Sequence, residues 1–402
     1  MMAAIRQSYT QQKYFGDNWL LVLTILLLSF GLVMMTSASI EIAQSQYGDL
    51  FFHFKRQIRF LLMGLMASGV ILLIPVELWQ RFSPLLMLAA FVMLVLVLVP
   101  GIGKTVNGST RWLNLGFMSL QASEPAKLFV VIFMAHYLSK QNEFFVNTWK
   151  GFLIPFGLVA PVVLLLLMEP DFGASVVMLI AMFGMMFLAG AKLYKFIILF
   201  VMAAIGGGGL IWAEEYRWRR LMSFIQALSD PFNEDVVYGS GYQLAQALIA
   251  FGRGEWFGIG LGNSIQKIYF LPEAHTDFVF AIIAEELGLF SVILLVVAFI
   301  AFITRAMLIA RKNERNDNYF AAYMAYGIAF LFTGQVLINI AVNIGLLPTK
   351  GLTLPFLSYG GSSLMICLVM VAMLLRIDIE NEKSGLEKTS SKSRTRIKSS
   401  RP

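Results

Sequence analysis

Long uncharged, apolar stretches alternate with short polar segments along the chain. Nine of them are each about long enough to cross the roughly 30 Å hydrocarbon core of a membrane as a helix. These nine stretches are 18–40, 60–76, 82–103, 151–168, 172–191, 196–213, 287–304, 318–349 and 351–375. A tenth, about 125–140, is weaker because it contains Lys127 and His136. The pattern predicts an all-α, polytopic integral membrane protein with ten transmembrane helices.

The composition supports this fold class. Hydrophobic residues make up 58% of the chain and charged residues 14%, which is far outside the range of soluble domains. Cys367 is the single cysteine, so an intramolecular disulfide is excluded. The first apolar stretch exceeds the roughly 7–15 residues of a signal-peptide core, and we expect it to remain as an uncleaved helix.

The distribution of Lys and Arg along the chain matches a membrane topology and does not indicate nucleic-acid binding. The net charge is +7, and Lys and Arg concentrate on one side if the N-terminus is cytoplasmic and ten spans follow. Both termini are therefore predicted to be cytoplasmic, although the basic segment 55–59 lies outside against this trend. We expect a cytoplasmic tail (1–17), one membrane domain (18–376) and a disordered basic tail (377–402) attracted to anionic lipid.

One connection between spans is long, namely residues 214–277, which face the periplasm in this topology. Loops of this length are usually functional or disordered. This loop is rich in Trp, Tyr, Phe and Gly, and its aromatic side chains need burial. The sequence therefore predicts one long, structured periplasmic loop.

The segment LPEAHTDF at 271–278 places Asp277 where the long loop meets the next apolar run. An ionisable side chain beside hydrocarbon is costly and commonly marks a functional cavity. Asp is also a frequent N-cap of a helix, so capping is an equal alternative. If the protein does chemistry, Asp277 is its first candidate.

Conspicuous polar residues gather at four outward-facing places. These places are 107–127, EPDFG at 169–173, the end of the long loop, and LLPTKGLTLPFLSYGGSS at 346–363. Because all four lie on one side of the membrane, they can form one composite site. Arg111 beside Trp112 suits a phosphate held against an aromatic wall, or Trp112 is an interfacial anchor. Lys350 is either a snorkelling cation or a phosphate contact.

Four further ionisable residues lie within the predicted spans or at their ends. Glu124 and Lys127 share a helical face, which allows an ion pair between them. We hypothesise instead that Lys127 pairs with Asp277, since both lie just inside the outer boundary. Glu285 and Glu286 either fix helix packing through buried hydrogen bonds or form a proton or ion path.

Together these segments resemble the SEDS family of polytopic membrane proteins (shape, elongation, division and sporulation), and its division branch most. The resemblance covers about 15–380. Its most specific motifs are GSGYQ at 239–243, AFGRGEWFGIGLGNSIQK at 250–267, LPEAHTDF at 271–278 with EELG at 285–288, and LPTKGLTLPFLSYGGSS at 347–363. Two motifs depart from the family pattern: Gln-Ala-Ser-Glu at 121–124 replaces Gln-Pro-Ser-Glu, and Glu169-Pro170-Asp171 replaces Gln-Pro-Asp. We expect Asp171 to cap the sixth span.

The resemblance implies a peptidoglycan glycosyltransferase that polymerises lipid II into β-1,4-linked glycan strands and releases undecaprenyl diphosphate at the division septum. It implies a class B penicillin-binding protein and other division proteins as partners. It also places the chain in the bacterial inner membrane, with the active site facing the periplasm. Asp277 would be the catalytic residue. The substrate-binding residues would be Arg111, Trp112, Glu124, Lys127, His275 and Lys350.

Two other functions fit the same residues: a lipid II flippase, or a non-catalytic scaffold for division proteins. As a base, Asp277 needs a pKa well above the value of about 3.9 for free aspartate. Burial and nearby Glu273 would raise this pKa, whereas a Lys127 partner would lower it. A divalent cation, Mg²⁺ or Mn²⁺, could share the diphosphate charge, but the sequence contains no ligand cluster that specifies one, and no cofactor is certain.

Overall fold

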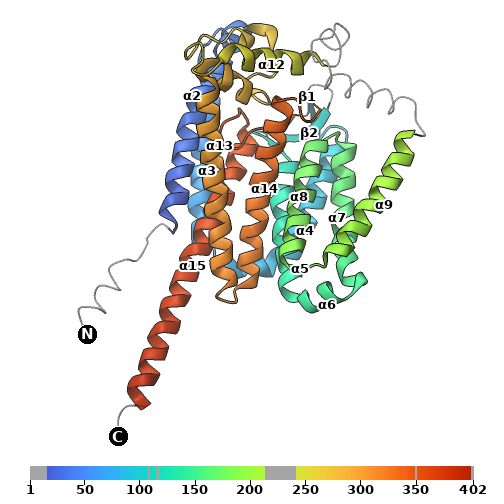
Figure 1. Ribbon diagram of the computed structural model, residues 1–402, viewed down its shortest axis with the longest axis vertical. Coiled ribbons are helices and arrows are strands. Elements are labelled where there is room, and N and C mark those ends of the chain that lie inside the picture. Colours follow the sequence, from blue (N-terminus) through green and yellow to red (C-terminus); the bar gives the residue numbers. More distant parts are fainter. Residues whose placement is uncertain are drawn as a thin grey trace.

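The structure is a computed structural model that describes residues 16–106, 109–114, 116, 118–212, 241–348 and 351–399, with side chains described except at 106, 203–212, 269 and 384–399. A bundle of helices forms the body of the described chain (Figure 1). Its long helices are α2 Asn18–Tyr47, α3 Phe52–Leu73, α4 Val76–Leu98, α5 Ser123–Lys140, α7 Trp149–Met168, α8 Phe172–Leu188, α9 Leu193–Trp212, α13 Val279–Glu314, α14 Tyr319–Asn343 and α15 Gly361–Ser399. Each overlaps one of the predicted apolar stretches.

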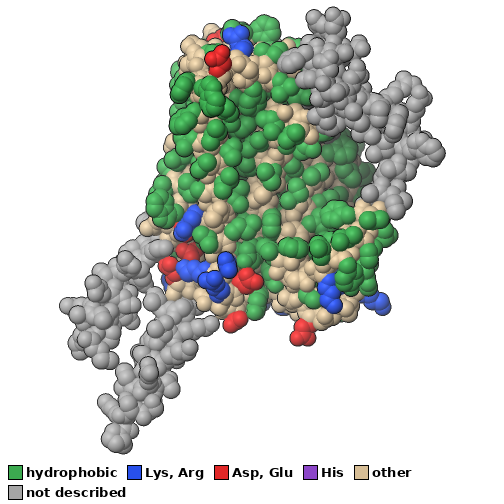
Figure 2. All heavy atoms as spheres, in the orientation of Figure 1, with side chains coloured by type: hydrophobic (Ala, Val, Ile, Leu, Met, Phe, Trp, Pro, Cys, Tyr) green, Lys and Arg blue, Asp and Glu red, His purple; other side chains and the backbone are tan. Residues whose placement is uncertain are grey.

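Length and hydropathy mark most of these helices as membrane spans. Among the described residues, seven helices are long and apolar enough to cross a membrane, namely α2, α3, α4, α7, α13, α14 and α15. The apolar helix α8 and the described apolar part of α9 are shorter. Apolar side chains cover the side of the bundle in Figure 2, whereas charged side chains gather at its two ends. The prediction of a polytopic, helical membrane protein is confirmed.

Two helices form the centre of the bundle. In their most apolar windows, α14 is 72% buried and α15 is 78% buried, whereas α3 is only 17% buried and α4 only 22%. Without a hydrophobic driving force in lipid, helices associate through close backbone approach at small residues. Gly327 on α14 shows this, because an added Cβ would lie 2.4 Å from Val131 on α5 and 2.6 Å from Met185 on α8. The outer helices remain free to face lipid.

One end of the bundle carries the short elements, and we call it the α12 end. A three-stranded antiparallel sheet in the order β1-β2-β3 lies here, formed by β1 Gly103–Val106, β2 Ser109–Asn114 and β3 Ser119–Gln121. Helix α12 Tyr242–Gly254 and the π-helix η1 Gln266–Phe270 lie at the same end, opposite the two termini (Figure 1). The sequence did not predict the sheet. The loop prediction of 214–277 holds for 241–277, which is structured; residues 213–240 lie outside the described residues.

The long loop is joined to α13 at a break in that helix. Gly288 adopts a left-handed conformation (φ 76°) that few other residues tolerate. The amides of Ile259 and Gly260 donate to the carbonyls of Glu285 and Glu286, at 3.0 Å each. An added Cβ at Gly288 would lie 2.4 Å from the backbone nitrogen of Gly258. The EELG motif therefore provides the backbone groups that hold the loop.

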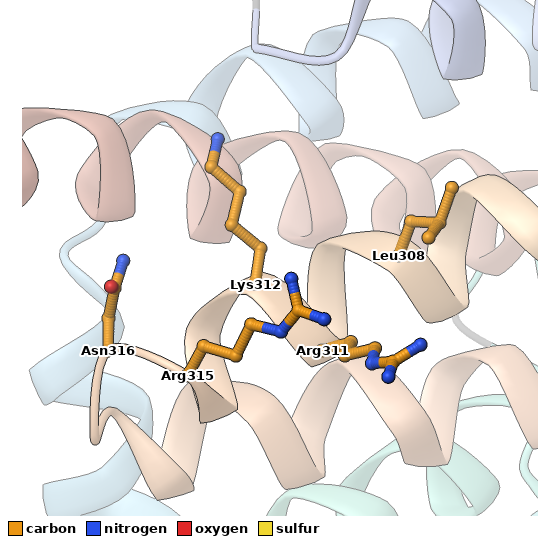
Figure 3. A pocket seen from close by; sticks show the side chains of 5 residues that line it. All are labelled: Leu308, Arg311, Lys312, Arg315 and Asn316. Atoms are coloured by element: carbon orange, nitrogen blue, oxygen red, sulfur yellow. The ribbon is translucent and has the colours of Figure 1, made fainter.

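At the opposite end of the bundle, α15 runs on beyond residue 376, as a helix to Ser399. The division of the chain into two tails and one membrane domain stays a prediction. Lys312 donates to Asp378 at 2.8 Å and to Glu382 at 3.1 Å. Figure 3 shows Lys312 directed away from Arg311 and Arg315, toward a neighbouring helix. These ion pairs hold the first residues beyond 376 against α13.

Candidate functional site

A cavity of about 900 Å³ opens at the α12 end of the bundle. Its lining comes from α2, α3, the sheet, the end of the long loop and the segment before α15. The charged and aromatic residues in this lining include His53, Arg56, Lys104, Arg111, Trp112, Glu273, His275, Asp277 and Tyr359. Four of the residues predicted from sequence, namely Arg111, Trp112, His275 and Asp277, therefore lie in one cavity.

Asp277 lies just before α13, in a segment that the rest of the protein holds firmly. Its amide donates to the carbonyl of Glu273 at 3.1 Å. Its own carbonyl accepts from the side-chain amides of Asn339 and Asn343 on α14, at 3.0 Å each. The residue preceding α13 is Phe278, and no side chain caps this helix among the described residues. Asp277 is thus not an N-cap, and its carboxylate is left for the cavity.

Burial raises the pKa of the Asp277 carboxyl to about 7, and the nearby Glu273 and Asp171 carboxylates act in the same direction. The Arg111 guanidinium acts oppositely and lowers this pKa. Burial disfavours the charged carboxylate because water no longer solvates it. A carboxyl that titrates near neutral pH can accept a proton far more readily than free aspartate does.

Gly351 brings the backbone close to both the Asp277 carboxylate and the Arg111 guanidinium. A Cβ added at this residue would lie 3.1 Å from Asp277 Oδ2 and 4.0 Å from Arg111 Nη1. Any side chain there would therefore press on the carboxylate. The absence of a side chain lets the last loop approach Asp277 closely.

The loop between α7 and α8 orients the Arg111 guanidinium through two hydrogen bonds. Its Nε donates to the carbonyl of Glu169 at 3.1 Å, and its Nη2 donates to the carbonyl of Pro170 at 2.7 Å. Trp112 follows on β2, so the strand, and not a helix end, positions both residues. The Glu169 carboxyl is 1% exposed, and burial raises its pKa to about 8. Next to Arg111 there is thus a carboxyl that is largely uncharged at neutral pH.

Asp171 begins α8, as predicted from sequence. Its carboxylate accepts from the amide of Ala174 at 3.2 Å, which is an N-cap hydrogen bond. The side chain of Gln121, which lines the cavity, lies 3.4 Å from the other carboxylate oxygen. Asp171 therefore stabilises the helix and adds negative charge near Asp277.

The predicted pairing of Lys127 with Asp277 is wrong. Lys127 donates to Glu124 at 3.0 Å, and both side chains are buried on α5, 2% and 4% exposed. Neither residue lines the cavity. The physical reason is that a partner three residues away on the same helix satisfies Lys127 locally, so no distant carboxylate is needed. Lys350 lies outside the described residues.

Glu285 and Glu286 are fully buried and paired. Glu285 accepts from Arg253 Nε at 3.1 Å and from the hydroxyl of Ser264. Glu286 accepts from Lys267 Nζ at 2.8 Å and from the Ser37 hydroxyl. These bonds tie the long loop and α2 to α13. The two acids therefore serve packing, which was the structural alternative for them.

Sequence reasoning missed several residues of the cavity, above all His53, Arg56 and Tyr359. A signal for Arg56 was present, because the segment 55–59 places basic residues on the outer side against the positive-inside trend. Tyr359 lies in the FLSYGG motif. Within the described chain, no three His, Cys, Asp or Glu side chains come together as a metal site. A divalent cation stays a prediction.

Comparison with known proteins identifies relatives over nearly the whole chain. Residues 18–383 match the family FTSW_RODA_SPOVE, described as "Cell cycle protein". A relative from Pseudomonas fluorescens (strain SBW25), named "Probable peptidoglycan glycosyltransferase FtsW", is 51% identical over 355 residues and covers 88% of this chain and 86% of its own length. A relative of the same name from Coxiella burnetii (strain RSA 493 / Nine Mile phase I) is 47% identical over 369 residues, with 91% and 97% covered.

Solved structures share this fold. A chain from the structure described as "Structural coordination of polymerization and crosslinking by a peptidoglycan synthase complex" matches with a TM-score of 0.75 and 25% identity, over 91% of this chain and 98% of that chain. The rod shape determining protein RodA of Thermus thermophilus matches with a TM-score of 0.65 and 26% identity, over 91% and 97%. The chain belongs to the family of FtsW, RodA and SpoVE cell cycle proteins, which is the SEDS family that its motifs predicted.

Proposed function

We propose that the cavity at the α12 end polymerises lipid II into β-1,4-linked glycan strands, with Asp277 as the general base. The enzyme class, peptidoglycan glycosyltransferase, is that of the named relatives and agrees with the sequence prediction. The observation that carries the proposal is a carboxyl with a pKa of about 7 in a cavity of about 900 Å³ that the Arg111 guanidinium also lines. Cavities of this size accommodate large ligands.

In the proposed reaction, the acceptor sugar's 4-hydroxyl oxygen forms a bond to C1 of the donor. The bond from C1 to the lipid diphosphate breaks, and the diphosphate leaves with the bonding electrons. Asp277 takes the hydroxyl proton, which makes the oxygen a better nucleophile. Arg111, held by two backbone carbonyls, is oriented to stabilise the charge that develops on the diphosphate. Trp112 lines the same cavity and supplies an aromatic wall.

The proposal includes a topology and a partner. Ten spans with both termini in the cytoplasm put the α12 end in the periplasm, at the bacterial inner membrane and the division septum. The structure described as a peptidoglycan synthase complex, which coordinates polymerization and crosslinking, supports a class B penicillin-binding protein as the partner that crosslinks the strands. Polymerisation and crosslinking would then occur on the same side of the membrane.

The test measures glycan formation from lipid II by the purified protein together with its transpeptidase partner. Asp277→Asn should lower the rate about 100- to 10,000-fold, because that is the usual contribution of a positioned general base, and it should leave the melting temperature unchanged. The matched control is Asp49→Asn, which changes a carboxylate in the turn between α2 and α3 that pairs with Lys55 and does not line the cavity. The control should polymerise at the wild-type rate.

Three outcomes would overturn the proposal. If Asp277→Asn polymerised lipid II at the wild-type rate, Asp277 would not be the general base. Failure of the wild-type protein to polymerise lipid II, together with transbilayer movement of lipid II in liposomes, would identify a flippase. A protein that does neither and only binds its division partners would be a scaffold.

A further inference from the structure

Two histidines from distant parts of the chain meet inside the cavity. His53 lies in the first turn of α3, and His275 lies two residues before Asp277. Their ring centroids are 4.9 Å apart, and both rings also contact Tyr359, at 4.8 Å from His53 and 5.5 Å from His275. The backbone holds this arrangement, because the Tyr359 amide donates to the His275 carbonyl at 2.9 Å. Two separate elements thus place the pair in the cavity that Asp277 also lines.

Three of the four ring nitrogens of this pair have no hydrogen-bond partner among the described residues. His53 is 6% exposed, and both of its ring nitrogens are buried without a hydrogen bond to any described residue. The Nδ1 atom of His275 is likewise buried and unpaired within the described chain. Buried polar groups in folded proteins are nearly always paired, since an unpaired one forfeits its hydrogen bonds to water. Both side chains line the cavity, so a bound molecule can supply the missing bonds.

The surroundings favour an uncharged ligand group. Burial lowers the pKa of His275 to about 4, so this imidazole is neutral at physiological pH. A neutral imidazole offers one donor and one acceptor, which is what a hydroxyl or an amide group pairs with. A diphosphate, by contrast, is bound best by cations, and Arg111 provides one in another part of the cavity. Tyr47, Arg56 and Tyr359 approach the pair, and none of them is acidic.

We propose that His53 and His275 form a double-imidazole subsite that hydrogen-bonds a hydroxyl or acetamido group of the substrate's saccharide. This inference rests on the proposed function, and it adds the part of the substrate that this side of the cavity recognises. His53 and His275 contribute binding and positioning, while Asp277 performs the proton transfer. The saccharide is thereby held by neutral groups and the diphosphate by cations.

The decisive variant is His53→Phe. Phenylalanine keeps an aromatic ring against Tyr359 and Tyr47 but removes both nitrogens. KM for lipid II should rise about 3- to 10-fold with kcat nearly unchanged, because the lost hydrogen bonds are made in the ground state and in the transition state alike. His53→Gln, which retains a donor and an acceptor, should recover part of the loss. His136→Phe, the same change on α5 outside the cavity, should leave KM unchanged.

A binding measurement separates this inference from the catalytic one. Using the Asp277→Asn background, affinity is measured for lipid II, for lipid II with its peptide stem shortened to one residue, and for undecaprenyl diphosphate. His53→Phe should weaken binding of both disaccharide lipids and leave undecaprenyl diphosphate unaffected. Equal weakening of all three ligands, a loss confined to the full-length stem, or no weakening would each overturn the saccharide subsite. These outcomes do not depend on whether Asp277 is the base.

Discussion

Asp277 and the pair Glu285 and Glu286 lie within ten residues of each other in the chain at the α12 end, yet their surroundings are opposite. Glu285 and Glu286 are fully buried and accept hydrogen bonds from Arg253, Ser264, Lys267 and Ser37. The Asp277 carboxylate faces a cavity and accepts no hydrogen bond from the described residues. His53 and His275, which line the same cavity, also carry nitrogens that have no partner among the described residues.

The contrast shows how function can be read from incomplete pairing. A buried charge with every bond made stabilises one arrangement of the chain and has no capacity left for a ligand. A charge or imidazole that is held in place but left unpaired costs stability, and the cost is offset only when a substrate binds. Depth in the membrane did not separate the two groups of acids, whereas their hydrogen-bond partners do.

The largest effect is expected from breaking the paired group. Lys267→Met leaves Glu286 buried without its cation and should lower the free energy of unfolding by about 3–5 kcal/mol. Thermal unfolding in detergent measures this. Lys55→Met, which breaks the exposed pair with Asp49, is the control and should change the stability far less, because water screens an exposed ion pair. Equal losses in the two variants would contradict the structural role of the buried pair.

The next largest effect, a loss of polymerisation activity, is expected from filling the space beside the Asp277 carboxylate. Gly351→Ala places a methyl group against the Asp277 carboxylate, and a misplaced catalytic group should reduce polymerisation about 10- to 100-fold. Gly69→Ala is the control, because it adds the same methyl group on α3 with no atom within 4 Å. Full activity of Gly351→Ala would mean that the last loop does not constrain the carboxylate.

The pH dependence tests the ionisation of the same group. Because the base must be deprotonated and its pKa is raised to about 7, kcat/KM should fall about tenfold per pH unit below pH 7 and level off above it. The residual activity of Asp277→Asn should lack this limb. A flat wild-type profile between pH 5 and 7 would show that Asp277 is already ionised at low pH.

The smallest effect separates capping from electrostatics at Asp171. Asp171→Ala removes the N-cap of α8 and should cost about 1 kcal/mol of stability. It also removes a negative charge that raises the pKa of Asp277, so the acid limb of kcat/KM should move to lower pH. Thr148→Ala removes the corresponding cap of α7 and should lower stability similarly without moving the limb.

The sequence predicted the helices well because a membrane span is set by a local property, its run of apolar residues. The small sheet was missed because its strands are short and are formed by pairing between β1, β2 and β3, which no single strand reveals. Lys127 was assigned to Asp277 from depth alone, whereas the direction of a side chain depends on which helices pack against it. His53 was missed because its partner is distant in the sequence: only the folded chain brings the start of α3 next to residues 275–277.

The hydrogen bonds from the Asn339 and Asn343 side chains to the Asp277 carbonyl have a mechanical consequence. The carboxylate is anchored to α14 as well as to its own segment, so a displacement of α14 along the membrane normal would carry the carboxylate with it. That helix passes through the centre of the bundle and is long and apolar enough to cross a membrane. A movement at the far end of α14 would therefore be transmitted along the helix to the Asp277 carboxylate.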